Sequence, residues 1–280
     1  LLALLRAAAG RSGGRWFIAG LVLGAGTLTV ASLLLFFPVA ILWARRQAQP
    51  LHFRAMAALI LGLLLTIAPV TLRNLLVGGE WVLISHNAGI NFYIGNNPDY
   101  DLTTSIRPGR DWQELTGMPE REAGVTGRGA ASRHFFGRSL DYLIAEPLGY
   151  LGLQLRKLYL FWRGDEIPRN LDPYFARHQS WLLQGLLWIR GMAFPFGLVS
   201  PLALMGMLFY LRNPASRSPA GNLILLFVAT YTLAVVLFFV TSRYRLPVTP
   251  ALLLFAGFAV MHLRLLRGRA LVRRLVLLGL

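Results

Sequence analysis

The chain has 280 residues, of which 55% are hydrophobic and only 14% are charged, and its formal net charge is +16. A water-soluble domain usually carries roughly 25% charged residues, and a strongly basic domain usually binds nucleic acid. All 12 acidic residues lie between Glu80 and Asp172, together with 10 basic ones, whereas the rest of the chain holds 18 basic residues and no acidic one. Apolar runs punctuated by arginine and free of acid are typical of membrane proteins that follow the positive-inside rule. The composition therefore argues against a soluble enzyme and against a nucleic-acid binder.

The chain contains no cysteine, which rules out a disulfide framework, a thiolate metal site and a cysteine nucleophile. Its single lysine is Lys157. The first residue is Leu1 rather than methionine, so we expect further sequence upstream of it.

Five uncharged stretches are long enough for membrane helices, which need roughly 17–25 apolar residues. They are Trp16–Ala44, Ala55–Leu72, Gly191–Leu211, Ser218–Ser242 and Leu246–Leu263. The first stretch either crosses once or forms a hairpin of two short helices that breaks near Gly26–Thr29. We favour the hairpin because 29 residues is long for one span and short for two, and because a hairpin keeps Arg6, Arg11 and Arg15 in the cytoplasm. These features predict an all-α polytopic membrane protein with about 5–6 transmembrane helices and an extracytoplasmic insert of mixed structure.

The arginines in the short connections set the expected orientation. They place the connections around residues 45–54 and 212–217, and the tail after residue 263, in the cytoplasm. The predicted parts are N-terminal transmembrane segments (1–72), an extracytoplasmic region with interfacial helices (73–190), and C-terminal transmembrane helices with a basic cytoplasmic tail (191–280).

The external region mixes several local patterns. Trp81–Ser85 and Ile90–Ile94 are rich in β-branched and aromatic residues and predict two strands or extended segments. Turns are expected between and after them, and the Gly-, Pro- and charge-rich residues 99–129 are expected to form a loop. Ala130–Tyr142 is a candidate helix, and Pro147 can open another.

The helix expected after Pro147 is amphipathic. Leu148, Leu151, Leu155 and Leu158 recur at helical spacing, with Arg156 and Lys157 on the other side. This pattern predicts a helix that lies along the membrane interface.

The segment Thr241–Pro247 places Arg243, Tyr244 and Arg245 in a very short external connection, where the positive-inside rule does not expect arginine. Arginine presents a planar fork of donors that fits phosphate, so this segment suits a lipid-linked phosphate or pyrophosphate. The alternative is that both arginines extend to lipid headgroups.

Amide side chains crowd the start of the external region. Asn74, which follows Arg73, and Asn87, Asn91, Asn96 and Asn97 lie within 24 residues, together with His86. Amides both donate and accept hydrogen bonds, as sugar hydroxyls require. The alternative is turn formation, because asparagine tolerates left-handed backbone.

The adjacent pair Asp165 and Glu166 is the most suggestive of the acidic groups. It could serve general acid–base chemistry or hold a divalent cation, or it could form a solvated loop with salt bridges to nearby arginines. The five histidines are scattered without an i, i+4 pair, so no histidine metal site is expected. Gly20 and Gly24 have the spacing that lets membrane helices pack closely.

Two segments resemble a known family. Ala68–Asp99 (APVTLRNLLVGGEWVLISHNAGINFYIGNNPD) is similar to a stretch of bacterial glycosyltransferase family 39 and related GT-C proteins, the dolichyl-phosphate-mannose-protein mannosyltransferase-like group. Thr241–Gly257 (TSRYRLPVTPALLLFAG) resembles the Arg-Tyr-Arg-x-Pro start of a late membrane helix in these proteins. Trp16–Ala44 is similar to their paired short helices, although Val30 stands where arginine is common.

The resemblance implies an inverting transferase of the bacterial inner membrane. It would move a sugar from a polyprenyl-phosphate donor to a protein or lipid acceptor on the extracytoplasmic side, with membrane lipids as further partners. The family's catalytic acid lies in an early external loop, so the general base is expected upstream of Leu1, with Asp165 and Glu166 as weaker candidates. The resemblance then assigns lipid-phosphate contacts to Arg243, Tyr244, Arg245 and Arg73, and sugar or acceptor contacts to Asn74, His86, Asn91, Asn96 and Asn97.

Two other functions remain open from the sequence. A non-catalytic membrane scaffold would share every feature above except the chemistry. A transporter or flippase fits less well, because transporters usually show broken helices and buried charges at the membrane midplane.

Overall fold

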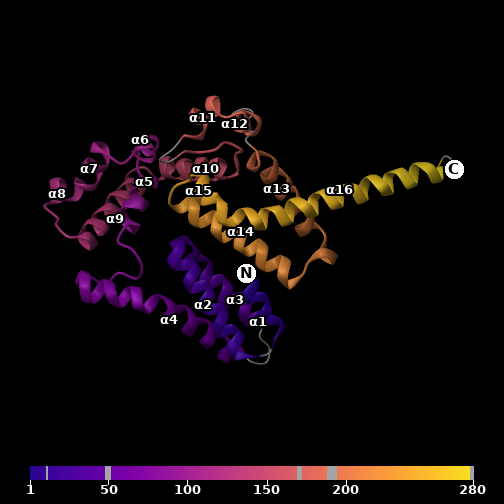
Figure 1. Cartoon of the computed structure of the whole chain (residues 1–280), viewed down its shortest axis with the longest axis horizontal. Coiled ribbons are helices and arrows are strands. Elements are labelled where there is room, and N and C mark those ends of the chain that lie inside the picture. Colours follow the sequence, from indigo (N-terminus) through magenta and orange to yellow (C-terminus); the bar gives the residue numbers. More distant parts are fainter. Residues whose placement is uncertain (11, 48–51, 169–171, 188–193, 278–280) are drawn as a thin grey trace. The chain divides into compact units, whose positions relative to one another are not determined.

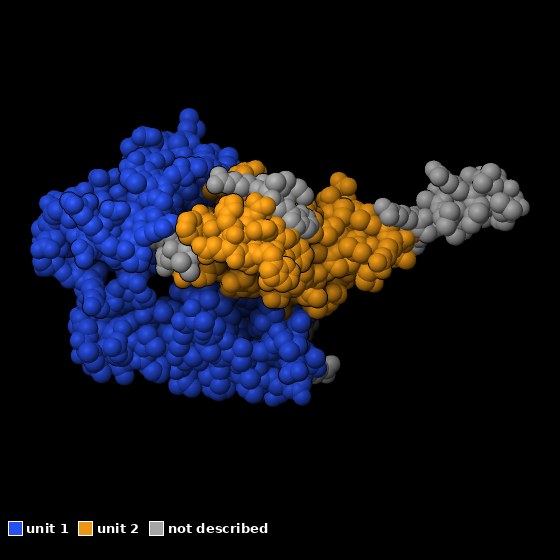
Figure 2. All heavy atoms as spheres, turned by 45° about the horizontal axis from the view of Figure 1, so that its top comes forward, with its two compact units in different colours: residues 1–158, 229–240 blue, residues 159–228, 241–280 orange. Residues whose placement is uncertain are grey.

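The computed structural model describes residues 1–10, 12–47, 52–168, 172–187 and 194–277, and side chains up to residue 265. This part of the chain is all-helical and contains no β-strand. The all-α prediction is therefore confirmed, whereas the mixed structure predicted for the insert is wrong. The chain divides into two compact units, residues 1–158 with 229–240, and residues 159–228 with 241–280 (Figure 2).

Unit 1 contains an N-terminal bundle and a group of shorter helices (Figure 1). The bundle consists of α1 (Leu2–Ala9), α2 (Gly13–Thr29), η1 (Ala31–Leu35), α3 (Phe36–Gln47) and α4 (His52–Gly78). The shorter helices are α5 (Ala88–Gly95), α6 (Tyr100–Ser105), α7 (Arg110–Thr116), α8 (Met118–Ala123), α9 (Arg128–Ala145) and α10 (Pro147–Trp162).

Glycines bring α2 and α4 into backbone contact. A Cβ atom built at Gly20 would overlap the Leu59 carbonyl oxygen, and one built at Gly62 would overlap the Phe17 carbonyl oxygen. Thr66 adds a hydrogen bond from its hydroxyl to the Leu21 carbonyl oxygen, 3.4 Å away. Small residues allow such close approach where lipid leaves no hydrophobic force between helices.

The stretch from Trp16 to Ala44 is not one continuous helix. Val30 is extended and separates α2 from η1 and α3. The chain then folds back, since the rings of Trp16 at the start of α2 and Trp43 near the end of α3 lie 6.4 Å apart.

The strand predicted at Ile90–Ile94 is wrong, because this segment belongs to helix α5. Ile90 and Ile94, four residues apart, are both buried on one helical face. Gly89 lies so close to the Ser132 carbonyl oxygen of α9 that a Cβ would not fit between them. Tertiary packing thus overrides the strand propensity of the residues.

The other predictions for this region differ in outcome. Trp81–Ser85 contains no strand, and the loop predicted over residues 99–129 contains the three helices α6, α7 and α8. The helices predicted at Ala130–Tyr142 and after Pro147 are confirmed as α9 and α10.

Unit 2 is built mainly on α13 (Phe196–Arg212) packed against α16 (Thr249–Leu277). Gly206 contacts the Phe255 backbone without room for a Cβ, and Tyr210 packs edge-on against the Phe255 ring at 5.8 Å. The remaining elements are α11 (Pro173–Ala176), η2 (Arg177–Gln179), α12 (Trp181–Leu186), η3 (Pro214–Ser216), α15 (Ser242–Arg245) and η4 (Leu246–Val248), together with the first part of α14 (Pro219–Leu237), whose residues from 229 on belong to unit 1.

Three helical segments in the described part are long and apolar enough to cross a membrane. They are Phe53–Gly78, Pro219–Leu237 and Ser242–Leu265. Helix α13, in the stretch predicted to start at Gly191, is apolar but shorter, and Gly191 itself lies outside the described residues. The chain is thus a helical membrane protein with three candidate spans.

We expect Gly20→Ala to destabilise the protein by about 1–3 kcal/mol, because the new methyl group forces α2 away from α4. Gly257→Ala in α16 is the matched control, since no atom lies within 4 Å of its new Cβ. This control should be neutral or stabilising by up to about 1 kcal/mol, as expected for glycine replaced by alanine within a helix. Thermal unfolding in detergent micelles measures both, and equal unfolding midpoints for the two variants would contradict the packing argument.

Candidate functional site

The amides predicted to bind sugar bond mainly to the protein itself. Asn74 is buried, and its Nδ2 donates to the carbonyl oxygens of Val82 and Ile84 at 3.0 and 3.2 Å. Asn97 is also buried, and its Nδ2 donates to the Tyr93 carbonyl oxygen at 2.6 Å. These side chains fix the backbone around them and do not converge on a common open site.

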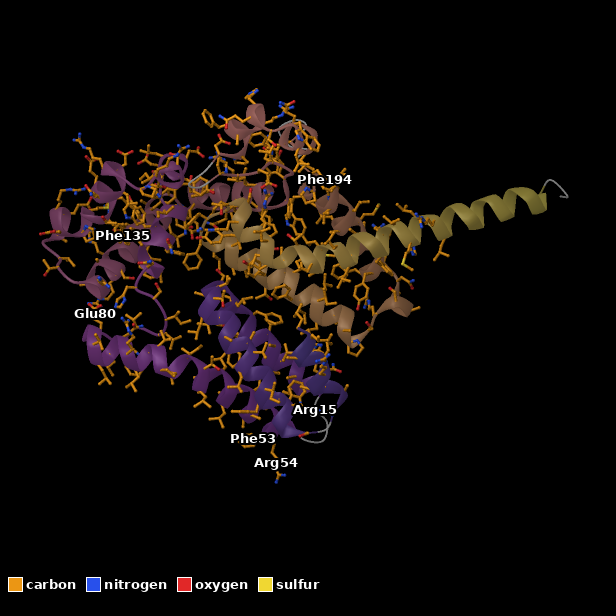
Figure 3. All side chains as sticks on the ribbon, viewed as in Figure 1. Arg15, Phe53, Arg54, Glu80, Phe135 and Phe194 are labelled. Carbon is orange, nitrogen blue, oxygen red and sulfur yellow. The ribbon has the colours of Figure 1, made fainter. Side chains whose placement is uncertain are left out.

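The other predicted sugar and phosphate residues of unit 1 lie apart from them. Arg73 is exposed on α4, and Asn91 is half-buried on α5. His86 Nε2 lies 2.9 Å from a carboxylate oxygen of Glu80. Glu80 (Figure 3) also accepts the Gly129 backbone N–H at 2.8 Å, so His86 and Glu80 hold the first turn of α9.

Lys157 forms the centre of a buried polar cluster that the sequence did not predict. Its side chain is 0% exposed, and Nζ donates to the Gly95 carbonyl oxygen at 2.8 Å, Asn96 Oδ1 at 3.0 Å and the Phe238 carbonyl oxygen at 3.0 Å. Three acceptors match the three hydrogens of an ammonium group. The only signal in the sequence was a single lysine on a leucine-rich helix.

Asn96 extends this cluster. Its Oδ1 also accepts from Gln154 at 2.8 Å, and its Nδ2 donates to the carbonyl oxygens of Phe92 and Leu237, both at 2.8 Å. Asn96 is 0% exposed. The cluster therefore ties the end of α5 and the end of α14 to one face of α10, and it leaves Asn96 no open face for a sugar.

We expect the stability of the protein to depend on pH through Lys157. Burial lowers the pKa of Lys157 from 10.5 to about 7. Between these two values the unfolded chain binds the extra proton, so the free energy of unfolding should rise as the pH rises from 7 to 10. The variant Lys157→Met has no titratable group at this position. The wild type should therefore become more stable relative to this variant as the pH rises over that range. Melting temperatures measured across the range test this, and a constant difference between the two proteins would contradict it.

In unit 2, Arg245 is buried and bonds to the backbone of another segment. Its exposed fraction is 2%. Nη1 donates to the Arg163 carbonyl oxygen at 2.6 Å, and Nη2 donates to the Asp165 carbonyl oxygen and to Ser242 Oγ. The guanidinium also stacks on Phe196, 4.1 Å from the ring centre. Arg245 thus positions the turn that carries Arg243 and is not open to bind a phosphate.

Ser242 forms two further hydrogen bonds between the same two segments. Its backbone N–H donates to the Ile167 carbonyl oxygen at 3.1 Å, and its Oγ accepts the Ile167 N–H at 2.5 Å. The turn at α15 is therefore fixed on residues 163–167, which follow α10.

Arg243 and Tyr244 remain at the surface of this turn. Arg243 is exposed, and its guanidinium lies 5.1 Å from the Tyr244 ring centre, with a 3.2 Å hydrogen bond from Nη2 to the Tyr244 hydroxyl. Of the two arginines of this turn, only Arg243 presents its charge to solvent.

The acidic pair lies in the segment held by Arg245. Asp165 Oδ2 pairs with Arg163 Nε at 2.7 Å, whereas Oδ1 is buried without a hydrogen-bond partner. Glu166 lies 3.8 Å from Arg245. The described residues contain no group of three histidine, aspartate or glutamate side chains that could hold a metal ion.

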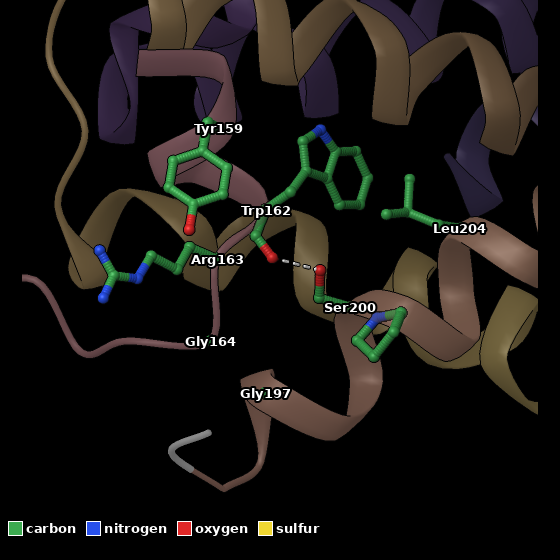
Figure 4. Close-up of a pocket in the computed structure, with 8 residues that line it drawn as sticks. Tyr159, Trp162, Arg163, Gly164, Gly197, Ser200 and Leu204 are labelled. Atoms are coloured by element: carbon green, nitrogen blue, oxygen red, sulfur yellow. Dashed lines mark hydrogen bonds between the residues drawn. The ribbon is translucent and has the colours of Figure 1, made fainter. Parts of the chain in front are cut away.

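A cavity of about 450 Å³ opens beside this segment, between the end of α10 and the start of α13 (Figure 4). The Ser200 hydroxyl donates to the Trp162 carbonyl oxygen at 2.6 Å and joins the two helices. The lining combines aromatic, apolar and cationic groups, namely Tyr159, Trp162, Arg163, Gly164, Gly197, Ser200, Pro201 and Leu204. Sequence reasoning did not single out this cavity, because its walls come from two helices far apart in the chain.

Comparison with known proteins finds no matching family model, no matching curated protein and no matching solved structure.

The two arginines of α15 should respond differently to substitution. Arg245→Ala should lower the free energy of unfolding by at least about 2 kcal/mol, because it leaves buried carbonyl groups without donors. Arg243→Ala should change it by less than about 0.5 kcal/mol, as is usual at an exposed position. Urea unfolding of the detergent-solubilised variants compares them directly. If the larger loss followed Arg243→Ala, the assignment of roles would be reversed.

Proposed function

We propose that the chain forms part of an integral membrane glycosyltransferase that transfers a sugar from a polyprenyl-phosphate donor to a protein or lipid acceptor. The observation that carries this proposal is the cavity with Arg163 in its wall, next to the turn that exposes Arg243. Arg245 bonds to the Arg163 carbonyl oxygen and so links the two features. The resemblance of Ala68–Asp99 and Thr241–Gly257 to GT-C transferases supports the same conclusion.

The composition of the cavity suits an amphipathic donor. Arginine guanidinium groups fit phosphate oxygens and stay charged at every relevant pH. Trp162, Pro201 and Leu204 offer apolar surface to the first isoprene units, while the exposed Tyr159 can stack against a ring. We therefore assign the phosphate to Arg163 and Arg243, with Tyr244 beside them.

The reaction needs two further contributions. The acceptor hydroxyl attacks the anomeric carbon of the sugar, and the lipid phosphate departs with the electron pair of the broken bond. A cation near the departing phosphate stabilises its growing charge, and a general base removes the proton from the acceptor. Within this chain the candidate for that base is Asp165, whose Oδ1 has no hydrogen-bond partner.

The proposal includes a topology. Residues 73–190 lie on the extracytoplasmic side of a bacterial inner membrane, which places the arginine-rich short connections in the cytoplasm. The α2–α3 hairpin and α13 join the three candidate spans to make five or six crossings.

Transfer from a radiolabelled polyprenyl-phosphate sugar, measured in membranes that contain the full-length protein, tests the proposal. Arg163→Gln and Arg243→Gln should each lower kcat/KM by about 10–100-fold, the equivalent of one lost charge-assisted hydrogen bond. The matched control is Arg212→Gln, an exposed arginine at the other end of α13, which should leave transfer unchanged.

Three outcomes separate the alternatives. Loss of transfer in both site variants but not in the control supports the phosphate site. Equal activity in all three variants would refute that site, even if the protein is a transferase. No transfer by the wild type with any polyprenyl-phosphate sugar, despite correct insertion, would favour the non-catalytic scaffold.

A further inference from the structure

Helix α10 has its polar and apolar faces reversed relative to a helix on a water-soluble surface. Four leucines along one face are exposed and define what we call the α10 stripe: Leu148 (83%), Leu151 (53%), Leu155 (59%) and Leu158 (41%). Helices in water turn such a stripe toward the protein core. Here the stripe faces away from the rest of unit 1.

Away from the stripe, α10 buries Leu153 and Lys157 and half-buries Gln154, whereas Arg156 is exposed. Lys157 is completely buried, and Gln154 and Lys157 both donate to Asn96 Oδ1. Arg156 is the other charged residue of the helix, and a bidentate pair with Asp101, at 2.8 and 2.9 Å, holds its guanidinium against α6. No charged side chain therefore lies on the stripe.

An interfacial helix of the ordinary kind would turn its lysine toward water. Lys157 instead satisfies all three ammonium hydrogens inside the protein. The helix thus buries its lysine and exposes the four leucines of the stripe, an arrangement that water does not favour. An apolar solvent gives the opposite preference and explains both faces.

We propose that the α10 stripe lies against lipid acyl chains at the membrane interface. The candidate spans expose leucines to the same degree, as at Leu61 (58%) and Leu254 (61%), so the stripe resembles the surface that these spans would turn toward lipid. The helix ends with Tyr159 and Trp162, the residue types that concentrate at headgroup level. This inference does not depend on the proposed sugar transfer.

The absence of cysteine in the natural sequence makes a direct test simple. Single variants Leu148→Cys, Leu151→Cys and Leu155→Cys are labelled with a nitroxide and reconstituted in nanodiscs of phosphatidylethanolamine and phosphatidylglycerol. Collisions of the label with oxygen, which concentrates in lipid, are compared with collisions with a water-soluble nickel chelate. Leu61→Cys on α4 is the lipid control, and Arg110→Cys on the exposed face of α7 is the water control.

The stripe variants should give an oxygen-to-nickel ratio like that of Leu61→Cys and severalfold above that of Arg110→Cys. A ratio like that of Arg110→Cys would overturn the proposal in favour of a water-exposed helix. Low access to both reagents would overturn it in favour of a protein contact, either a second copy of this chain or another subunit. Three independent positions keep the test decisive if one variant fails to fold.

Discussion

The capture of backbone carbonyl oxygens by a buried basic side chain is the interaction that both units share. Helices leave their last carbonyl groups without partners and carry partial negative charge at that end. Lys157 donates hydrogen bonds to the carbonyl oxygens of Gly95, the last residue of α5, and Phe238, the residue after α14. Arg245 donates hydrogen bonds to the carbonyl oxygens of Arg163 and Asp165, just beyond the end of α10. In each unit one side chain thereby joins segments that no regular hydrogen-bond ladder connects.

Lys157 and Arg245 both bond to carbonyl oxygens rather than to carboxylates, and this affects what they contribute to the free energy of folding. A buried cation costs much desolvation free energy, and a neutral group in its place would leave several buried acceptors unpaired. The nearest carboxylate to Arg245 is Glu166 at 3.8 Å, beyond hydrogen-bonding distance. Each buried basic side chain and its carbonyl acceptors therefore stabilise the fold only as a set.

Sequence patterns predicted the features that depend on local composition. Apolar length identified the three candidate spans, and helical spacing identified α10, because both signals lie within a few turns of chain. The strand predicted at Ile90–Ile94 failed because β-branched and aromatic residues also suit a short buried helix, and the contact of Gly89 with α9 decided between them.

The polar residues were harder to place because their partners are remote in sequence. Asn96 was expected to face a sugar, yet it bonds to Leu237, 141 positions away, and to Lys157. The cavity beside Arg163 likewise needs Ser200 and Leu204 from another helix. No local pattern encodes such pairings. The sequence could thus show which amides and cations the chain holds, but not which of them face inward.

Arg243 and Arg245 lie on the same helical turn, yet Arg243 is exposed and Arg245 is buried. Residues two apart on a helix point in nearly opposite directions, since each residue advances the side chain by about 100°. Burying Arg245 against residues 163–167 therefore turns Arg243 outward, as observed. The two arginines therefore cannot bind one phosphate together, and in the proposed phosphate site the second cation comes from another segment. Arg163 is the candidate that the structure offers, because the bond from Arg245 to its carbonyl oxygen holds its backbone beside the same turn.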